Sequence, residues 1–374
     1  MNTWPSEHSE YRDAATGVRV HQLTSQACIN HATYFLQSSF TPDGRTLLFT
    51  SYRTGSAQLF EVDFPHGEIR QLTAGGAIHP FSAAIHPSGE SIFFVRGGEI
   101  LELNRKTLGE RSIVRWEGAQ LGECSPDRRG EWITAAAKQG AQSGIVAGRA
   151  DGTQWIFIPF ERTVIHPQFH PLQREWIEFA GDPAPRMHRV RRDGSGLECL
   201  YRHTNDEFVV HETFLGDGGL GDSGDLVFTV WPHALRRMNW ESREITTIAS
   251  FNAWHITPNR AGTLVLCDTN HPDEGLFLVD VLTGERKAIC QSGSSNQGSQ
   301  WKTSRYALKE DFDRARNAAE AGALSWMEVA TDTVYGPQWT HPHPSFSADE
   351  RMVVFASDRT GHPQVYVAEL DEAN

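Results

Sequence analysis

The chain has 374 residues, a formal net charge of −13, 39% hydrophobic residues and 22% charged residues. This composition is ordinary for a globular protein, and the length is sufficient to bury a large core. Binding to a phosphate backbone needs a basic surface, so the acidic balance and the lack of a Lys/Arg run argue against a nucleic-acid partner. An anionic substrate would need a local cationic site instead.

The cysteines and the N-terminal segment bear on location. Five cysteines lie far apart and form no CxxC pair, at Cys28, Cys124, Cys199, Cys267 and Cys290. Such an odd, sparse set predicts buried thiols in a reducing compartment. The segment MNTWPSEHSEYRD lacks the apolar stretch of a signal peptide, and no run of about 18 apolar residues occurs. We therefore expect a cytoplasmic protein with no membrane partner.

A short phrase recurs along the chain: an apolar strand, a turn rich in Pro, Asp and Gly, and a strand rich in β-branched and aromatic residues. The turns centre on residues 42, 87, 126, 171, 216, 258 and 348, which are 45, 39, 45, 45, 42 and 90 residues apart. A period of ~40–45 residues with several short strands per unit is typical of propeller blades. The repeat predicts an all-β fold, a seven-bladed β-propeller.

The ends of the chain are consistent with a closed ring. The last unit offers only three strands, and GVRVHQLT at 17–24 is similar to the fourth strand of other units, such as GEIRQLT at 67–73. We expect this N-terminal strand to close the last blade and remove its exposed edge.

The doubled spacing before the last turn indicates an insertion. It contains KTSRYALKEDFDRARNAAEAGALSW, whose composition favours helix. This predicts a partly helical insertion near 291–335, between the sixth and seventh blades of a single domain spanning 1–374. An eighth, degenerate blade is the alternative.

Histidines recur just before the repeated turns. In a propeller the innermost strand of each blade lines the central channel, so side chains at the strand starts should meet at one mouth. Six of the seven units place a histidine there, at His31, His79, His166, His211, His255, His341 and His343. A lone histidine at such a position more often makes a backbone hydrogen bond. Six in register, gathered without carboxylates, favour a metal site or a site for an anionic ligand.

The segment GPQWTHPHPSF carries the most specific pattern. Residues i and i+2 of an extended strand face the same way, so His341 and His343 can both point inward, with Gln338 just upstream. The prolines restrict the backbone around these donors. A further ligand must come from elsewhere: the repeat favours His255, and His271 is the alternative. Imidazoles with an amide oxygen and no thiolate suit a divalent ion, Mn²⁺ first and then zinc, nickel or iron.

These motifs resemble those of the oligogalacturonate lyases, polysaccharide lyase family 22. The match includes GPQWTHPHPSFSADERMVVFASDRTGHPQVYV, NHATYFLQSSFTPDGRTLLFTSYRTG and VVHETFLGDG, and it runs from about residue 17 to the end. The resemblance implies a cytoplasmic, metal-dependent enzyme of pectin degradation. It would cleave short oligogalacturonides, typically unsaturated digalacturonate, by β-elimination to 5-dehydro-4-deoxy-glucuronate-type products.

The resemblance also implies residue roles. The metal ligands would be His255, Gln338, His341 and His343, with manganese as the ion. The catalytic residues would be His211 and Arg186. The insertion and the less distinctive surroundings of His255 depart from the family pattern, which leaves the oligosaccharide and the fourth ligand open.

The chemistry of β-elimination on a uronate accounts for these residue types. Removal of the C5 proton beside a carboxylate builds a dianionic enolate, which a metal and a fixed cation such as Arg186 can stabilise. An imidazole such as His211 is a suitable base. Arg186 has two interpretations, as a clamp for the substrate carboxylate or as a participant in proton transfer. Further substrate contacts are expected from His31, His79, His166 and Arg53.

Three other functions are alternatives. A non-enzymatic propeller scaffold would not need clustered metal donors. A propeller attached to a serine peptidase would need a Gly-x-Ser-x-Gly elbow on an α/β domain, which is not present in the sequence. A lyase of the same fold acting on a different uronate oligosaccharide remains open.

Overall fold

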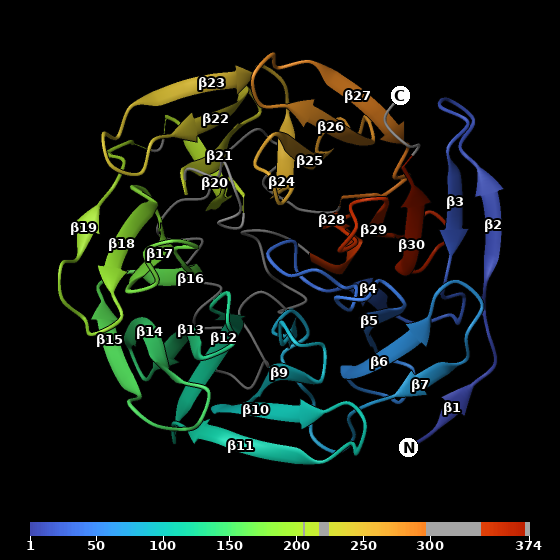
Figure 1. The fold of residues 1–374 in the computed structure, drawn as a ribbon, viewed down its shortest axis with the longest axis horizontal. Helices are drawn as coiled ribbons and strands as arrows, with labels where there is room; N and C mark the ends of the chain where they lie inside the picture. The colour runs from blue at the N-terminus through green and yellow to red at the C-terminus, as the bar shows by residue number, and fades with distance from the viewer. Residues whose placement is uncertain (205, 217–223, 297–337, 371–374) are drawn as a thin grey trace.

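The computed structural model describes residues 1–204, 206–216, 224–296 and 338–370. Its strands form seven antiparallel sheets arranged around one centre, as the ribbon in Figure 1 shows. Each sheet is a blade, and strands succeed one another from the centre to the rim. This confirms the all-β, seven-bladed β-propeller predicted from the repeat. Within the described ranges the one helical element is the short 3-10 turn η1 (Gln338–Thr340).

The blades follow one another in chain order. The strands of the first four blades are β4 (Asn30–Ala32), β5 (Thr46–Ser51), β6 (Gln58–Asp63) and β7 (Ile69–Gln71); β8 (Ala84–Ile85), β9 (Ser91–Arg96), β10 (Glu99–Asn104) and β11 (Glu110–Arg115); β12 (Ala119–Pro126), β13 (Trp132–Gln139), β14 (Gln142–Arg149) and β15 (Ile156–Phe160); and β16 (Thr163–Phe169), β17 (Trp176–Asp182), β18 (Met187–Arg191) and β19 (Glu198–Cys199). The strands of the last three are β20 (Phe208–Phe214), β21 (Leu226–Trp231), β22 (Ala234–Met238) and β23 (Ile245–Ala249); β24 (Ala253–Pro258), β25 (Leu264–Thr269), β26 (Leu276–Asp280) and β27 (Arg286–Cys290); and β28 (Ser345–Phe346), β29 (Met352–Ser357) and β30 (Gln364–Glu369), completed by β3 and β2.

The N-terminal segment closes the ring. Strand β3 (Arg19–Gln22) pairs with β30 of the last blade, and β2 (Ser9–Arg12) adds a fifth strand outside it. The closing strand predicted at 17–24 is therefore confirmed. Before it, β1 (Thr3–Trp4) pairs with β7 of the first blade. The first twenty-odd residues thus cross from the first blade to the last, along the rim seen at the right of Figure 1.

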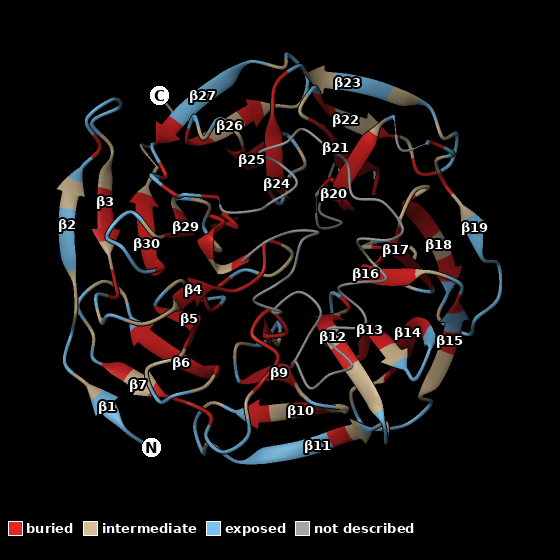
Figure 2. Ribbon diagram, turned by 180° about the vertical axis from the view of Figure 1, so that it is seen from behind, coloured by how far each residue is buried: buried red, intermediate tan, exposed pale blue. Residues whose placement is uncertain are grey.

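The core lies between neighbouring blades. Figure 2 shows buried residues along the inner strands and exposed ones on the outermost strands β2, β11, β19, β23 and β27. One cluster packs Phe49 and Phe60 of the first blade against Val354 and Val365 of the last, all fully buried. Apolar β-branched and aromatic side chains thus hold the seam of the ring as they hold the other interfaces.

Of the predicted insertion near 291–335, the structure describes only residues 291–296, which have no helix or strand assignment. Its helical content and an eighth blade lie outside the described residues, so the insertion and the single-domain boundaries stay predictions. None of the five cysteines forms a disulfide. In the described part of the chain, no helix has the length and hydropathy needed to cross a membrane.

Candidate functional site in the central channel

A β-bulge interrupts the innermost strand at the same point in four consecutive blades. The strand register shifts between Leu121 and Cys124 in β12, Ile165 and Gln168 in β16, Val210 and Thr213 in β20, and Ala253 and Ile256 in β24. The residues within these four shifts include Glu123, His166, His211 and His255. A bulge bends the strand and re-aims a side chain, and bulges of this kind are common next to active sites.

Three of the channel histidines also have unusual backbone conformations. The φ angles of His166, His211 and His343 are 59°, 56° and 44°. L-residues seldom adopt this left-handed region, and residues held there cluster at functional sites. The surrounding sheet therefore holds these imidazoles in positions that a regular strand would not provide.

Ring contacts show that the predicted histidines meet. The ring of His255 lies 3.9 Å from that of His343 and 4.4 Å from that of His211, centroid to centroid. His211 in turn lies 5.9 Å from His166, and His341 lies 6.0 Å from His343. All of these side chains are buried. The structure thus brings imidazoles from the fourth to the seventh blades into one continuous group.

Three of these histidines lie close enough together to hold a metal ion. One ring nitrogen of each of His255, His341 and His343 can be chosen so that all three atoms lie within 4.8 Å of one another. We call these three residues the channel cluster. The other proposed ligand, His271, is not part of it, because its Nε2 contacts the carbonyl oxygen of Asn296 at 3.0 Å. Of the two alternatives left by the sequence, the geometry brings His255 to the cluster.

The orientation of His255 is fixed by Asp268 of the neighbouring strand. Nδ1 of His255 contacts Oδ2 of Asp268 at 2.7 Å, and the His255 amide donates to Oδ1 at 2.6 Å. Burial raises the pKa of Asp268 to about 8, although the hydrogen bond from the His255 amide opposes the shift. Nε2 of His255 is buried and has no hydrogen-bond partner among the described residues. A carboxyl group behind an imidazole, with the other nitrogen facing the site, is the arrangement typical of metal-bound histidine.

The closing segment supplies the other two imidazoles. Nε2 of His343 contacts the backbone oxygen of Gln338 at 3.1 Å, and its buried Nδ1 lacks a hydrogen-bond partner in the described ranges. The Trp254 indole donates to Nδ1 of His341 at 3.4 Å. Burial, followed by the neighbouring His255, holds the pKa of His343 well below its usual value. The ring therefore stays neutral at physiological pH, which is the form that binds a metal. Gln338 itself is buried in η1, directly upstream.

A loop with two aromatic residues, Tyr34 and Phe35, packs against the channel histidines. Phe35, in the connection after β4, has its ring 5.2–5.5 Å from those of His166, His211 and His255. The hydroxyl of Tyr34 contacts Nε2 of His166 at 2.7 Å. Thr257 of the sixth blade donates to the Phe35 carbonyl oxygen at 3.1 Å, which ties the loop to the ring. The repeat gave no indication of this loop, because it lies between strands of one blade.

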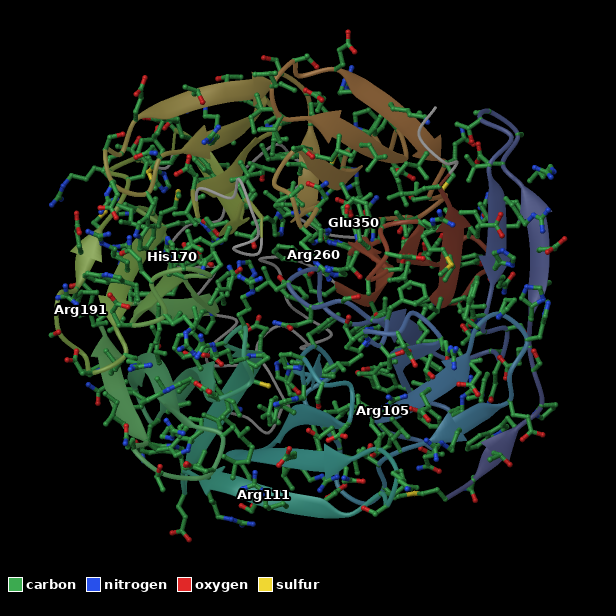
Figure 3. All side chains as sticks on the ribbon, viewed as in Figure 1. Arg105, Arg111, His170, Arg191, Arg260 and Glu350 are labelled. Atoms are coloured by element: carbon green, nitrogen blue, oxygen red, sulfur yellow. The ribbon has the colours of Figure 1, made fainter. Side chains whose placement is uncertain are left out.

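Phe35 also borders a second space. It helps to line a cavity of about 540 Å³ together with Arg260 and Glu350, which Figure 3 labels near the inner ends of their blades. None of the channel histidines lines this cavity. His170, also labelled, packs against Phe214 and Trp240 and does not contact the channel rings. Histidine content alone therefore does not mark the site.

Carboxylates occupy one side of the channel, contrary to the expectation of imidazoles without carboxylates. Nε of Arg186 donates to Oε1 of Glu212 at 2.9 Å, and its Nη1 donates to Asp182. Burial raises the pKa of Glu212, but Arg186 and His166 outweigh it and hold the carboxyl ionised. Glu178 is buried beside them without a hydrogen-bond partner in the described part of the chain. The repeat of strand starts did not indicate these acids, because Glu178 and Asp182 lie on the second strand of the blade, β17.

Two buried acids, Glu178 and Glu123, hold their protons more tightly than usual. Burial, followed by the charge of Glu212, raises the pKa of Glu178 well above its usual value. Burial also raises the pKa of Glu123, which stands where the other blades have histidine. A neutral carboxylic acid can donate a hydrogen bond to an anionic ligand, whereas an ionised one would repel it. This side of the channel is therefore less negative than its composition suggests.

His211, the predicted base, lies between the two sides. Its ring contacts Trp254 at 4.5 Å, and its Nδ1 is buried without a hydrogen-bond partner in the ranges that the structure describes. Burial, then His255 and His166, lower the pKa of His211 well below its usual value. The ring is therefore neutral and has a lone pair available in the channel.

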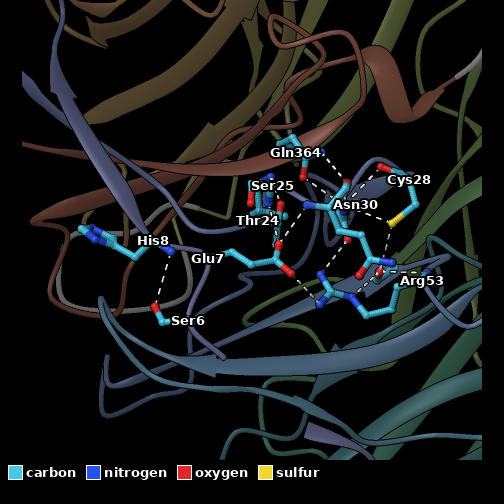
Figure 4. A network of polar contacts seen from close by, with 12 residues as sticks. Ser6, Glu7, His8, Thr24, Ser25, Cys28, Asn30, Arg53 and Gln364 are labelled. Carbon is cyan, nitrogen blue, oxygen red and sulfur yellow. Dashed lines mark hydrogen bonds and ion pairs between the residues drawn. The ribbon is translucent and has the colours of Figure 1, made fainter. Parts of the chain in front are cut away.

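The other predicted contact residues divide into two groups. His31 stacks on Phe81 at 4.5 Å, and Phe81 lies 5.5 Å from His343, which links the first two blades to the channel cluster. Burial lowers the pKa of both His31 and His79 to about 4. Arg53 is enclosed elsewhere: its guanidinium contacts Ser51 and also Glu7 and Asn30, which Figure 4 labels beside it. This enclosure favours a structural role for Arg53.

Comparison with known proteins agrees with this geometry. The family model for oligogalacturonate lyase matches residues 3–126. An oligogalacturonide lyase of Pectobacterium atrosepticum is 23% identical over 100% of this chain and 98% of its own length. An oligogalacturonate lyase of Dickeya dadantii is also 23% identical, over 97% of this chain and 96% of its own. The chain is therefore similar to oligogalacturonate lyases over nearly its whole length.

Solved structures of oligogalacturonate lyases share the fold. One, determined in complex with manganese, superposes with a TM-score of 0.81 at 20% identity and covers 99% of this chain and 98% of its own. Another, from Vibrio parahaemolyticus, has a TM-score of 0.79 at 20% identity, with the same coverage. The whole ring, including the closing N-terminal strands, is therefore an architecture that this family uses.

Proposed function

We propose that this protein is a metal-dependent lyase that cleaves short oligogalacturonides, such as unsaturated digalacturonate, by β-elimination. The observation that carries the proposal is the channel cluster, three buried imidazoles within ligand distance of one another in a fold shared with oligogalacturonate lyases. Gln338, buried next to them, is the proposed fourth ligand. Mn²⁺ is the proposed ion, because a structure of a similar protein was determined in complex with manganese.

The donor set fits such an ion. His255 and His343 each have a buried nitrogen lacking a hydrogen-bond partner in the described segments, and Asp268 supports His255 from behind. Imidazole and amide oxygen, with no thiolate, suit manganese and related divalent ions. When bound, the ion would supply Lewis-acid stabilisation of the negative charge that develops on the uronate carboxylate, which is worth several kcal/mol.

His211 is the proposed base. It is neutral and buried, and it lies beside His255, so it can face the C5 proton of a uronate whose carboxylate lies at the channel cluster. The proton moves to the imidazole, the C4–O bond breaks, a C4=C5 double bond forms, and the glycosidic oxygen leaves with a proton. A positioned imidazole contributes about 10²–10⁴-fold to such a step.

Arg186 is the other proposed catalytic residue. Its guanidinium is buried and faces two carboxylates, Asp182 and Glu212, so its charge is already compensated. A substrate carboxylate would gain hydrogen bonds from it rather than net attraction. We therefore favour a role in orienting the substrate over one in proton transfer. His31, His79 and His166 are proposed contacts of the second sugar, and Arg53 is the weakest candidate of the set.

The cellular setting is part of the proposal. Five cysteines without a disulfide are compatible with a reducing compartment, so we propose a cytoplasmic location. The proposed substrate is a small anionic oligosaccharide.

Mass spectrometry of the products tests the proposal. The protein is treated with chelator, divided, and incubated with digalacturonate with and without Mn²⁺. Elimination gives two products whose masses sum to that of the substrate, whereas hydrolysis adds one water. We expect elimination products only with the ion, and their loss in His211→Gln with the ion still bound. Hydrolysis products, or cleavage that is independent of metal, would overturn it. A metal-bound protein inactive on digalacturonate but active on another uronate disaccharide would support the same-fold alternative.

A further inference from the structure

A second group of metal-ligating side chains lies far from the channel, where the N-terminal segment closes the ring. His8 precedes β2, Glu10 lies in β2, and His21 lies in β3, all on the outer edge of the last blade. His66 lies in the turn between β6 and β7 of the first blade. We call these four residues the seam cluster, because they meet where the first blade adjoins the last.

The distances within the seam cluster are those of ligands around one ion. Nε2 of His8 lies 2.9 Å from Nδ1 of His21, and Oε2 of Glu10 lies 3.9 Å from the same Nδ1. One ligand atom each of His8, Glu10 and His21 can be chosen so that all three atoms lie within 4.8 Å of one another. Bonds of 2.0–2.1 Å in tetrahedral geometry separate neighbouring ligand atoms by about 3.3 Å. Small side-chain shifts would therefore create the site.

The second ring nitrogens of His21 and His8 also have partners. Nε2 of His21 contacts Oε1 of Glu369 in β30 at 3.0 Å, so a carboxylate stands behind this ring. Nδ1 of His8 contacts Nδ1 of His66 at 3.2 Å, and the two rings meet edge to face at 4.4 Å. Such contacts orient metal-bound histidines and raise their basicity. The contact with His66 also links the group to the first blade.

The backbone around the cluster is positioned before any ion binds. Glu10 and His21 are directly opposite each other in the β2–β3 pair. Glu7, next to His8, accepts hydrogen bonds from the amides of Ser25 and Gln26 and pairs with Arg53 at 3.0 Å, as seen in Figure 4. His8 is thus held at the seam from both sides. Little conformational freedom remains to be lost when an ion binds.

The seam cluster is buried on one side and exposed on the other. His21 is almost fully buried, with 4% of its side chain exposed, whereas Glu10 is 51% exposed. The site would be open on one side, where water can complete the coordination.

We propose that His8, Glu10 and His21 bind a divalent transition metal ion, zinc in the first place, which fastens the N-terminal segment at His8 to the β2–β3 pair beside the seam of the ring. Two imidazoles and one carboxylate suit zinc. The role is structural, since none of the seam residues contacts the channel rings. A bound ion stabilises the closed ring because the unfolded chain does not hold the ligands together.

Metal counting on the full chain tests the proposal. The protein is stripped with chelator, equilibrated with Zn²⁺, separated from loosely bound ion, and analysed for zinc per chain. We expect one more ion per chain in the wild type than in His8→Ala or Glu10→Gln. His362→Ala, which removes an exposed histidine of the same blade, is the matched control and should bind as the wild type does. Glu10→Gln keeps the size of an exposed side chain, so misfolding cannot account for its result.

Thermal unfolding gives an independent readout. Zinc at ~100 times its Kd should raise the Tm of the His343→Ala variant, whose channel cluster is incomplete, by about 3 °C. The rise should disappear when Glu10→Gln is added. Equal zinc content and equal Tm shifts with and without Glu10→Gln would overturn the proposal and leave the seam cluster as a chain of hydrogen-bonded imidazoles. Both readouts are independent of lyase activity, so they do not depend on the proposed function.

Discussion

The channel cluster and the seam cluster contain similar side chains and differ in their surroundings. In the channel cluster all three imidazoles are buried, and the supporting carboxylate, Asp268, is fully buried as well. In the seam cluster the side chains range from buried to half exposed, and the supporting carboxylate, Glu369, is 45% exposed. Burial makes each interaction in the channel stronger and each unpaired nitrogen more costly. We infer that the first cluster serves chemistry and the second serves ring closure.

The position in the fold accounts for this difference. The channel cluster is built where innermost strands from several blades converge, so its residues are far apart in sequence and enclosed on all sides. The seam cluster is built on the outermost strand β2, on its neighbour β3 and on a turn of the first blade, where solvent has access. A propeller offers one enclosed centre and one seam, and in this chain both contain histidines.

The largest expected effect separates the two clusters by activity. His343→Ala removes one of three imidazoles, and with the ion its Lewis-acid contribution, so we expect elimination to fall by about 10³-fold or more. His8→Ala should leave the rate with Mn²⁺ unchanged. The measurement is the initial rate on digalacturonate at saturating Mn²⁺. A fully active His343→Ala variant, or an inactive but folded His8→Ala variant, would reverse the assignment of roles.

Removing the charge of the supporting acid should weaken metal binding more in the channel cluster than in the seam cluster. Asp268→Asn keeps the shape of a buried partner of His255 and should weaken Mn²⁺ binding in the channel by about 10–100-fold. Glu369→Gln, at the exposed seam, should weaken Zn²⁺ binding there by only a few-fold, because solvent screens its charge. Isothermal titration of each variant gives both affinities. Equal effects would mean that burial does not distinguish the two sites.

A smaller effect concerns stability at acid pH. The pKa values of His31 and His79 are about 4 in the folded chain, below the unfolded value of about 6.5. Their stabilising contribution is present above pH ~6.5 and is lost as the pH falls toward the folded value, because the unfolded chain binds the protons first. Lowering the pH from 7.5 to 5.5 should therefore reduce the free energy of unfolding by about 1.3 kcal/mol for each of these two histidines.

Urea unfolding of the chelator-treated protein at these two pH values measures the loss. The double variant His31→Gln/His79→Gln should show a flatter pH dependence than the wild type, whereas His362→Ala, which is exposed, should match the wild type. An unfolding free energy that does not change between the two pH values would contradict the burial of neutral imidazoles in the channel.

Much of the architecture could be predicted from the sequence. The spacing of the turns predicts the seven blades, and the likeness between 17–24 and 67–73 predicts the closing strand, because both follow from a repeated local pattern. The convergence of His166, His211 and His255 follows from the same repeat. The repeat also favours His255 over His271 as the further ligand, and the structure adds Asp268 behind His255 as support for that prediction.

Other features depend on contacts that no local pattern encodes. The bulges that aim His166 and His211 into the channel arise from the register between strands. The carboxylates Glu178 and Asp182 lie on a second strand, so the repeat of strand starts did not single them out. The seam cluster was missed for a similar reason, since His66 joins it from the first blade. Only the directly opposed Glu10 and His21 could have been found, given the β2–β3 register.

The central claim is that the channel cluster holds the metal ion that supports elimination. The most direct test is anomalous diffraction from crystals soaked in Mn²⁺, recorded at a wavelength where manganese scatters anomalously. The account predicts a peak bounded by Nε2 of His255, Nδ1 of His343 and a ring nitrogen of His341. Absence of a peak there, in a protein that is active with Mn²⁺, would contradict it.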